Sequence, residues 1–240
     1  MLYKWDCLEI MDQLIEQWIK VDAIITDPPY WTTACKRDTV IPFDKMWERL
    51  NKLIKPNWAI VLFWSEPFSS ALRMSNINDF RYDIIWEKER PTNILFMKKQ
   101  TAKVHENISI FYKEQPVYNP QMEKSMWVKN WNQKVDNSSK THTWQKFKYS
   151  KDYNAELRYP RSVIKINRDR NTTHPTQKPI ALMKYLIKTY ANEWETVLDF
   201  TMWSGTTWVA CHNLNRNFIW IELDDKYFEI AEQRILSTNQ

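Results

Sequence analysis

The 240-residue chain has no long apolar run, few cysteines and almost no glycine. A membrane-spanning helix needs about 20 consecutive apolar residues, so the absence of such a run predicts that the chain does not cross a membrane. The segment Met1 to Asp6 lacks the apolar stretch of a secretory signal. Cys7, Cys35 and Cys211 lie far apart without metal-ligand spacing. This pattern favours a cytoplasmic chain with reduced thiols and no metal site.

Glycine is scarce, whereas tryptophan is unusually common. Gly205 is the single glycine, although an average usage of ~7% corresponds to roughly 17 in a chain of this length. The sequence contains 14 tryptophans and 11 prolines. Prolines indicate turns, and turns ordinarily need glycine as well. The shortage of one residue and the excess of the other therefore call for a common explanation.

Positive charge is concentrated in one segment. Residues 113–170 contain 13 Lys and Arg against 6 Asp and Glu, whereas the whole chain has a net charge of only +5. A basic, aromatic segment without clear periodicity is typical of an insertion that binds a polyanion such as nucleic acid. A solvated basic surface is the alternative that charge alone leaves open.

Short apolar segments alternate with amphipathic ones over most of the chain. Apolar runs bounded by turn residues indicate buried strands, and apolar residues three or four positions apart indicate helices. Their alternation predicts an α/β fold with a doubly wound, mostly parallel sheet. The predicted strands are 21–26, 59–63, 82–86, 108–112, 196–200 and 218–221, and the predicted helices are 44–55, 67–74, 179–190, 206–214 and 224–236.

The tetrapeptide Asp27-Pro28-Pro29-Tyr30 follows the first of these strands. In an open α/β sheet, ligands bind beyond the carboxyl ends of the strands. The two prolines stiffen the loop and remove two backbone donors. A carboxylate and a proline carbonyl can then accept the two N–H groups of an exocyclic amine, and a tyrosine ring can stack on its base. A simple turn is the other interpretation of this motif when it is taken alone.

Two further motifs flank predicted helices. In the segment 197–207 a strand, a tight loop and a helix start follow one another, an arrangement that presents backbone N–H groups to an anion. Glu222 ends the next strand, where a carboxylate can bind a ribose diol. His174-Pro175-Thr176-Gln177-Lys178-Pro179 precedes another helix, and alone it indicates no more than a helix N-terminus.

Together the three motifs resemble the β-class DNA amino-methyltransferases, in which they occur in this order. The resemblance covers nearly the whole chain and extends to 5–9, 63–68, 86–88 and 105–107. It implies the Rossmann-like fold of S-adenosylmethionine-dependent methyltransferases. It also implies methyl transfer to N6 of a flipped-out adenine, because members with Asp in the tetrapeptide usually modify adenine N6 and those with Ser cytosine N4.

The resemblance also implies roles for individual residues. Asp27 and the Pro28 carbonyl hold the amine, Pro29 shapes the loop, and Tyr30 stacks on the base. Glu222 binds the cofactor ribose, Asp6 and Cys7 at the end of an N-terminal strand lie near its adenine, and Lys178 approaches its carboxylate. The methionine part is assigned to Asp199, Phe200, Thr201, Ser204, Gly205, Thr206 and Thr207.

The same resemblance predicts three parts of the chain. Residues 1–112 and 171–240 form the two halves of the catalytic domain, and 113–170 form a target-recognition insertion that binds duplex DNA. Phosphate contacts are predicted for Lys146, Lys148, Lys151, Arg158 and Arg161. A silent DNA-binding protein on the same scaffold, a cytosine-N4 enzyme, and an RNA or protein methyltransferase are the alternatives.

The chain departs from the family at glycine positions. Tryptophan stands where family members commonly have glycine, or where a turn favours it, at 5, 18, 31, 58, 64, 144, 194, 203, 208 and 220. Taken literally, an indole at 203 or 208 fills the cofactor's volume or blocks packing of the helix on its strand. We hypothesise that the gene comes from a lineage in which UGA encodes glycine and was translated with UGA as tryptophan. UGG codons at 31, 203, 208 and 220 would refute this, and deliberate engineering is the rival explanation.

Overall fold

The computed structural model describes residues 1–29, 40–124, 156–170 and 177–238, and the chain divides into two compact units. Unit 1 comprises Met1–Asn119 and Arg161–Gln240, and unit 2 comprises Pro120–Pro160. Unit 2 lies inside the predicted insertion 113–170, and its described strands are β6 (Glu123–Lys124) and β7 (Leu157–Arg158). Within the described ranges, no helix is both long and apolar enough to cross a bilayer.

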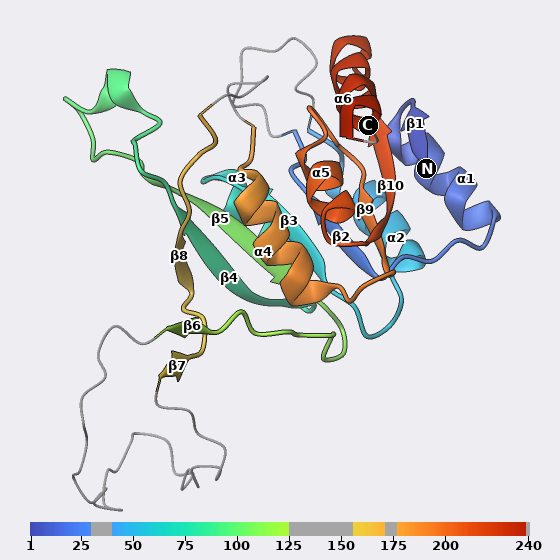
Figure 1. Ribbon diagram of the computed structural model, residues 1–240, viewed down its shortest axis with the longest axis horizontal. Helices are drawn as coiled ribbons and strands as arrows, with labels where there is room; N and C mark the ends of the chain where they lie inside the picture. The colour runs from blue at the N-terminus through green and yellow to red at the C-terminus, as the bar shows by residue number, and fades with distance from the viewer. Residues whose placement is uncertain (30–39, 125–155, 171–176, 239–240) are drawn as a thin grey trace, which may run out of the picture. The chain divides into compact units, whose positions relative to one another are not determined.

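Unit 1 is built on an eight-stranded sheet with the order β1-β10-β9-β2-β3-β5-β4-β8 (Figure 1). Every neighbouring pair is parallel except the two pairs formed by β5, which runs against β3 and β4. The predicted doubly wound, mostly parallel α/β sheet is therefore confirmed. The strands are β1 (Leu2–Lys4), β2 (Ala23–Thr26), β3 (Ile60–Trp64), β4 (Phe80–Glu87), β5 (His105–Phe111), β8 (Val163–Lys165), β9 (Thr196–Asp199) and β10 (Asn217–Glu222).

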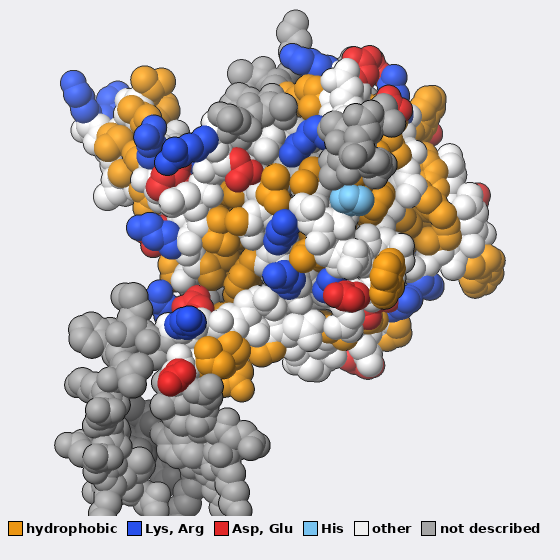
Figure 2. All heavy atoms as spheres, in the orientation of Figure 1, with side chains coloured by type: hydrophobic (Ala, Val, Ile, Leu, Met, Phe, Trp, Pro, Cys, Tyr) orange, Lys and Arg blue, Asp and Glu red, His pale blue; other side chains and the backbone are white. Residues whose placement is uncertain are grey.

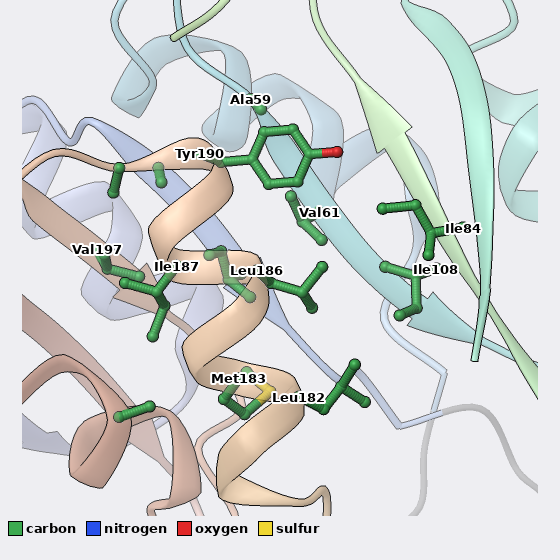
Figure 3. Close-up of a cluster of buried hydrophobic side chains, with 14 of the residues drawn as sticks. Ala59, Val61, Ile84, Ile108, Leu182, Met183, Leu186, Ile187, Tyr190 and Val197 are labelled. Carbon is green, nitrogen blue, oxygen red and sulfur yellow. The ribbon is translucent and has the colours of Figure 1, made fainter. Parts of the chain in front are cut away.

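Helices cover both faces of this sheet. Successive side chains of a strand point to opposite faces, and Ile25 packs in one apolar cluster with α4 and α5, whereas Ile24 packs in another with α1 and α2. Figure 3 shows Leu186 and Ile187 of α4 in the first cluster, with Val61 of β3 and Val197 of β9. The helices are α1 (Cys7–Glu16), α2 (Phe43–Leu53), α3 (Phe68–Ser75), α4 (Ile180–Tyr190), α5 (Thr206–His212) and α6 (Asp225–Thr238).

One α-helix and one strand of unit 1 were not predicted. The first is α1, for which Asp6 is the N-cap: its carboxylate accepts from Leu8 N–H at 2.8 Å and Glu9 N–H at 3.3 Å. Asp6 and Cys7 thus lie at a helix start and not at the end of a strand as expected, since β1 ends at Lys4. The second is β8, a three-residue strand inside the basic segment that is too short to show a periodicity.

Tryptophan occupies backbone conformations that favour glycine. Among the described residues other than glycine, φ is positive at Trp18 (59°), Trp194 (67°), Trp203 (51°) and Asn215 (56°). Asparagine tolerates this region, but for a bulky residue it is exceptional and costs about 1–2 kcal/mol. All three tryptophans belong to the predicted glycine positions.

Trp18 shows why glycine belongs there. It follows the C-cap of α1, and two backbone bonds form around it: Trp18 N–H to the Ile15 carbonyl and Ile19 N–H to the Leu14 carbonyl, both at 3.0 Å. This is the Schellman motif, in which a left-handed residue, usually glycine, ends the helix. The Trp18 side chain is 87% exposed, so no packing of the indole offsets the strain.

The buried tryptophans differ in whether the indole N–H has a hydrogen-bond acceptor. Trp47 donates to Ser75 Oγ and Trp86 to the Ile166 carbonyl, both at 2.8 Å, and neither is among the ten predicted glycine positions. Trp220 Nε1 is buried and has no acceptor among the described residues. A buried donor without a partner costs about 1–3 kcal/mol. The contrast supports the assignment of position 220 to the glycine class.

Candidate active site

Acidic residues gather at one edge of the sheet in unit 1. Strands β1, β10, β9 and β2 are parallel neighbours, so their carboxyl ends meet at the same edge. Asp27 follows β2, Asp199 ends β9, and Glu222 ends β10, while Asp6 follows β1. This is the edge at which open α/β sheets bind ligands.

A cavity of about 820 Å³ opens at this edge. Its size is within the range typical of small-molecule sites, and its walls combine apolar residues with a few carboxylates. Five of the predicted cofactor residues line it, namely Asp6, Cys7, Phe200, Thr201 and Glu222. Other lining residues are Leu8, Pro29, Ile41, Pro42, Trp203 and Tyr227.

Glu222 is held by backbone donors. Its Oε2 accepts from Trp203 N–H at 2.7 Å and its Oε1 from Asp224 N–H at 2.9 Å. Burial raises the pKa of Glu222 to about 7, against the lowering effect of these two bonds. Each carboxylate oxygen has a second lone pair, so the group can still accept from two hydroxyls in the cavity.

Asp199 connects three segments through its own carboxylate. Oδ1 accepts from Thr26 Oγ1 at 2.7 Å and from Thr201 N–H at 3.2 Å, and Oδ2 accepts from the Thr207 hydroxyl. Burial raises the pKa of Asp199 despite these bonds. The geometry thus joins the ends of β2 and β9 to the first turn of α5, so Asp199 shapes the cofactor loop.

Asp27 lies at the end of a chain of alternating buried charges. The Lys178 ammonium donates to Asp27 Oδ2 and lies 3.5 Å from Glu106 Oε2, and the Lys88 ammonium donates to Glu106 Oε1. Lys178 also lies over the Phe63 ring, 5.1 Å from its centroid. The prediction placed Lys178 at the cofactor carboxylate, whereas its described ion-pair partners are Asp27 and Glu106.

One oxygen of Asp27 remains available. Oδ1 is buried and has no hydrogen-bond partner among the described residues. Burial raises the pKa of Asp27 to about 6, Lys178 lowers it, and Glu106 raises it. At neutral pH the group is therefore a carboxylate with one paired oxygen and one oxygen free to accept.

Trp203 separates Asp27 from the large cavity. Its indole Nε1 donates to the Asp27 main-chain carbonyl at 2.9 Å, and its side chain lines both the large cavity and a second one of about 30 Å³. The second cavity is also lined by Asp27, Lys178, Asp199, Ser204, Thr206 and Thr207. That an indole at 203 fills cofactor space stays a prediction.

Trp208 lies elsewhere. It belongs to α5, and its buried ring packs towards β10, with its centroid 5.5 Å from that of Trp220 and 5.4 Å from that of His212. The prediction that an indole at 208 blocks the packing of helix on strand is therefore wrong for this structure. Gly205 N-caps α5 with φ of 74°, and an added Cβ there would lie 3.1 Å from Ala231 Cβ.

The structure describes two of the five predicted phosphate-binding residues. Arg158 is exposed in unit 2 and Arg161 is exposed in unit 1. Tyr30, Trp31, Cys35, Lys146, Lys148 and Lys151 lie outside the described residues, as do 171–176. Cys7, whose pKa burial raises to about 12, is a protonated thiol in the cavity wall.

Sequence reasoning gave no role to Lys88, Glu106 or Thr26. The segments 86–88 and 105–107 match the family, but a match does not reveal which side chain meets which. Lys88 and Glu106 come from the neighbouring strands β4 and β5, and Lys178 precedes α4. Their meeting at Asp27 depends on strand order, which the sequence pattern does not specify.

Comparisons with known proteins agree with this geometry. A family model described as DNA methylase, of the N6/N4 methyltransferase type, matches residues 21–233. The Type II methyltransferase M.HpaI of Haemophilus parainfluenzae is 26% identical over 225 residues, covering 90% of this chain and 68% of its own. The crystal structure of the M1.HpyAVI–SAM complex is 32% identical, covers 98% of both chains and has a TM-score of 0.66.

A more distant structure shares the fold alone. The cytosine-N4-specific PvuII DNA methyltransferase is 16% identical and has a TM-score of 0.70, covering 100% of this chain and 87% of its own. Since the family model spans most of the sequence, the chain belongs to the N6/N4 family of DNA methylases. It is a DNA methyltransferase, and the base that it modifies is the question that the site geometry addresses.

Proposed function

We propose that the chain transfers a methyl group from S-adenosylmethionine to N6 of an adenine flipped out of duplex DNA. The observation that carries this proposal is the free, buried Oδ1 of Asp27 at the sheet edge where the cavity of about 820 Å³ opens. The family match and the M1.HpyAVI structure with its cofactor support it.

The residues of the large cavity fit the cofactor. Glu222 can accept from the two ribose hydroxyls, and the apolar walls formed by Leu8, Ile41 and Pro42 suit an adenine ring. The first turn of α5, with Thr206 and Thr207, lies towards Asp27 and suits the amino-acid end. When bound, the cofactor supplies an activated methyl group on a sulfonium.

Asp27 acts on the amine. Its free Oδ1 accepts one N–H of the adenine amino group and raises the electron density on nitrogen. As the carbon–nitrogen bond forms, the carbon–sulfur bond breaks and its electron pair remains on sulfur. The nitrogen then has one proton in excess, which Asp27, with a pKa of about 6, can accept and pass to solvent. Alignment of the reacting atoms supplies much of the rate.

Adenine is favoured over cytosine because the residue at position 27 is aspartate. In the family that this chain resembles, the Asp form of the tetrapeptide goes with adenine N6. The Lys178 contact keeps one carboxylate oxygen occupied and leaves the other for the amine of the base. We also propose that residues 113–170 recognise the target sequence and that Tyr30 stacks on the flipped base.

The test measures the modified nucleoside. Two proteins are incubated with duplex DNA and methyl-labelled S-adenosylmethionine: the chain as printed, and a glycine-restored chain with Trp→Gly at the ten predicted positions. After digestion to nucleosides, label is expected in N6-methyladenine. Label in N4-methylcytosine would reject adenine specificity, label with single-stranded DNA alone would reject the duplex substrate, and no label in any reaction would reject catalysis.

Trp203 favours a second candidate for the chain as printed, namely a DNA-binding protein that does not methylate. Its indole lines the cavity between the cofactor region and Asp27. Calorimetry separates the two: DNA binding without cofactor binding by the printed chain supports the second candidate. Cofactor binding and methyl transfer by the printed chain would remove it.

A further inference from the structure

A basic and apolar arm extends from the sheet edge that carries the active site. The connection between β4, which ends at Glu87, and β5, which begins at His105, contains residues 90–104, which we call the β4–β5 arm (Figure 1). Its base is fixed by Asn93, whose Oδ1 accepts from Lys103 N–H at 2.7 Å and whose Nδ2 donates to the Thr101 carbonyl at 2.9 Å. Thr92 N–H donates to the Lys103 carbonyl at 2.9 Å. The arm is therefore an ordered projection of defined geometry.

Its tip consists of four consecutive exposed apolar side chains. Ile94, Leu95 and Phe96 form the short 3₁₀ helix η1 and are 68%, 92% and 57% exposed, and Met97 is 45% exposed. Isolated exposed apolar residues are normal, but a contiguous group on a projection indicates an interaction site. The two core clusters of the sheet do not include these side chains.

Only positive charges accompany this tip. Residues 90–104 contain Arg90, Lys98, Lys99 and Lys103 and no acidic residue. Arg90, Lys98 and Lys99 are exposed and form no ion pair within the described part of the chain. Figure 2 shows basic side chains beside apolar ones on this projection. The charge pattern is complementary to a polyanion.

The β4–β5 arm and Asp27 leave the sheet at the same edge. Since β5 is antiparallel to both β3 and β4, the strands β2, β3 and β4 run in one direction. The arm thus leaves the carboxyl end of β4 at the same edge at which Asp27 leaves β2. Three strand spacings of ~4.8 Å separate the two, roughly 14 Å, which corresponds to about four base pairs of a duplex.

We propose that the β4–β5 arm is a DNA-binding element that inserts its apolar tip into the duplex beside the target adenine while its lysines contact phosphates. Proteins that bend or open DNA use such apolar wedges between base steps, flanked by cations. Partial unstacking near the target also lowers the cost of extruding a base. This inference rests on the proposed duplex substrate and adds a second contact region outside residues 113–170.

The experiment removes the tip from the glycine-restored chain. Leu95→Ser together with Phe96→Ser is compared with Met74→Ser together with Ile77→Ser, which removes two apolar side chains that are 70% and 52% exposed elsewhere. The tip variant is expected to raise the Kd for duplex DNA about tenfold, measured by fluorescence anisotropy. 2-Aminopurine placed in the duplex within about four base pairs of the target should gain fluorescence when the protein unstacks it, and the tip variant is expected to abolish this gain. The control variant should change neither.

The lysines give an independent readout. Lys98→Gln together with Lys99→Gln is expected to weaken binding to all duplexes alike and to reduce the slope of log K against log salt by up to about 2. Because anisotropy needs no methyl transfer, it distinguishes failure of the arm from failure of the proposed reaction. Unchanged DNA affinity in both arm variants would overturn the inference. Loss of binding to phosphatidylserine vesicles in these variants, with DNA binding intact, would show that the arm binds an anionic membrane surface and would overturn it as well.

Discussion

The cofactor region and the target region of this active site are built by different means. The large cavity depends on backbone geometry: Glu222 is held by two main-chain N–H groups, and Trp203 and Gly205 beside it have positive φ. The target region depends on charged side chains, from Asp27 through Lys178 and Glu106 to Lys88. Among the described residues, a tryptophan at a predicted glycine position lines the first region, whereas the charged side chains of the second region come from other residue types.

The largest effect is expected in the target region. In the glycine-restored chain, Asp27→Ala removes the only carboxylate oxygen proposed to accept the adenine amine, so kcat should fall by at least about 100-fold. Labelled-methyl incorporation measures it. Because Asp27 does not line the large cavity, calorimetry should show that the affinity for S-adenosylmethionine changes far less than kcat. An Asp27→Ala enzyme with near-normal kcat would contradict the assignment of Asp27 to the target region.

The next effect is expected in the cofactor region. Trp203→Gly alone, made in the printed chain, should raise the affinity for S-adenosylmethionine by roughly tenfold to 100-fold, or about 1.4–2.8 kcal/mol. The reason is that the indole lines the cavity and separates it from Asp27. Calorimetry measures this, with Trp208→Gly as the control because Trp208 lies outside both cavities. Equal gains in the two variants would contradict the role of Trp203.

A smaller effect is expected from the buried charges next to Asp27, namely Lys178 and Glu106. Methyl transfer needs ionised Asp27, so its rate should rise with pH and level off above the Asp27 pKa of about 6. Glu106 raises that pKa and Lys178 lowers it. Glu106→Gln should therefore move the acid limb of kcat/KM to lower pH, and Lys178→Met to higher pH, each on the order of one unit.

The opposite signs make this test specific. Loss of stability alone would reduce the rate without moving the two limbs in opposite directions, and urea unfolding of each variant checks for it. Acid limbs that move in the same direction, or remain in place, would show that Glu106 and Lys178 do not set the pKa of Asp27.

The smallest effect concerns stability far from the site. Trp18→Gly should increase the free energy of unfolding by about 1 kcal/mol, because it relieves a left-handed conformation at an exposed helix end. Trp47→Gly should do the reverse, since Trp47 is buried and its indole bonds to Ser75. Urea unfolding of both variants tests it, and a destabilised Trp18→Gly chain would argue that this tryptophan is native.

The pattern of periodicity and motifs predicted much of the fold and part of the site. Apolar runs such as 21–26 and 196–200 correspond to β2 and β9, and the positions of Asp27, Asp199 and Glu222 at strand ends followed from them. The elements α1 and β8 were missed, since a cap is a local signal and a three-residue strand shows no period. The roles assigned to the individual site residues stay predictions.

By itself, the sequence indicated the chemistry: a resemblance to DNA amino-methyltransferases, an aspartate in the tetrapeptide, and tryptophans at predicted glycine positions. Only the tertiary structure decided which side chains meet. Strand order brings Lys88 of β4 and Glu106 of β5 to Lys178, and hence to Asp27. The same structure placed an apolar, basic arm at the catalytic edge. Local patterns specify single elements, whereas long-range pairing sets the distances between groups far apart in the chain.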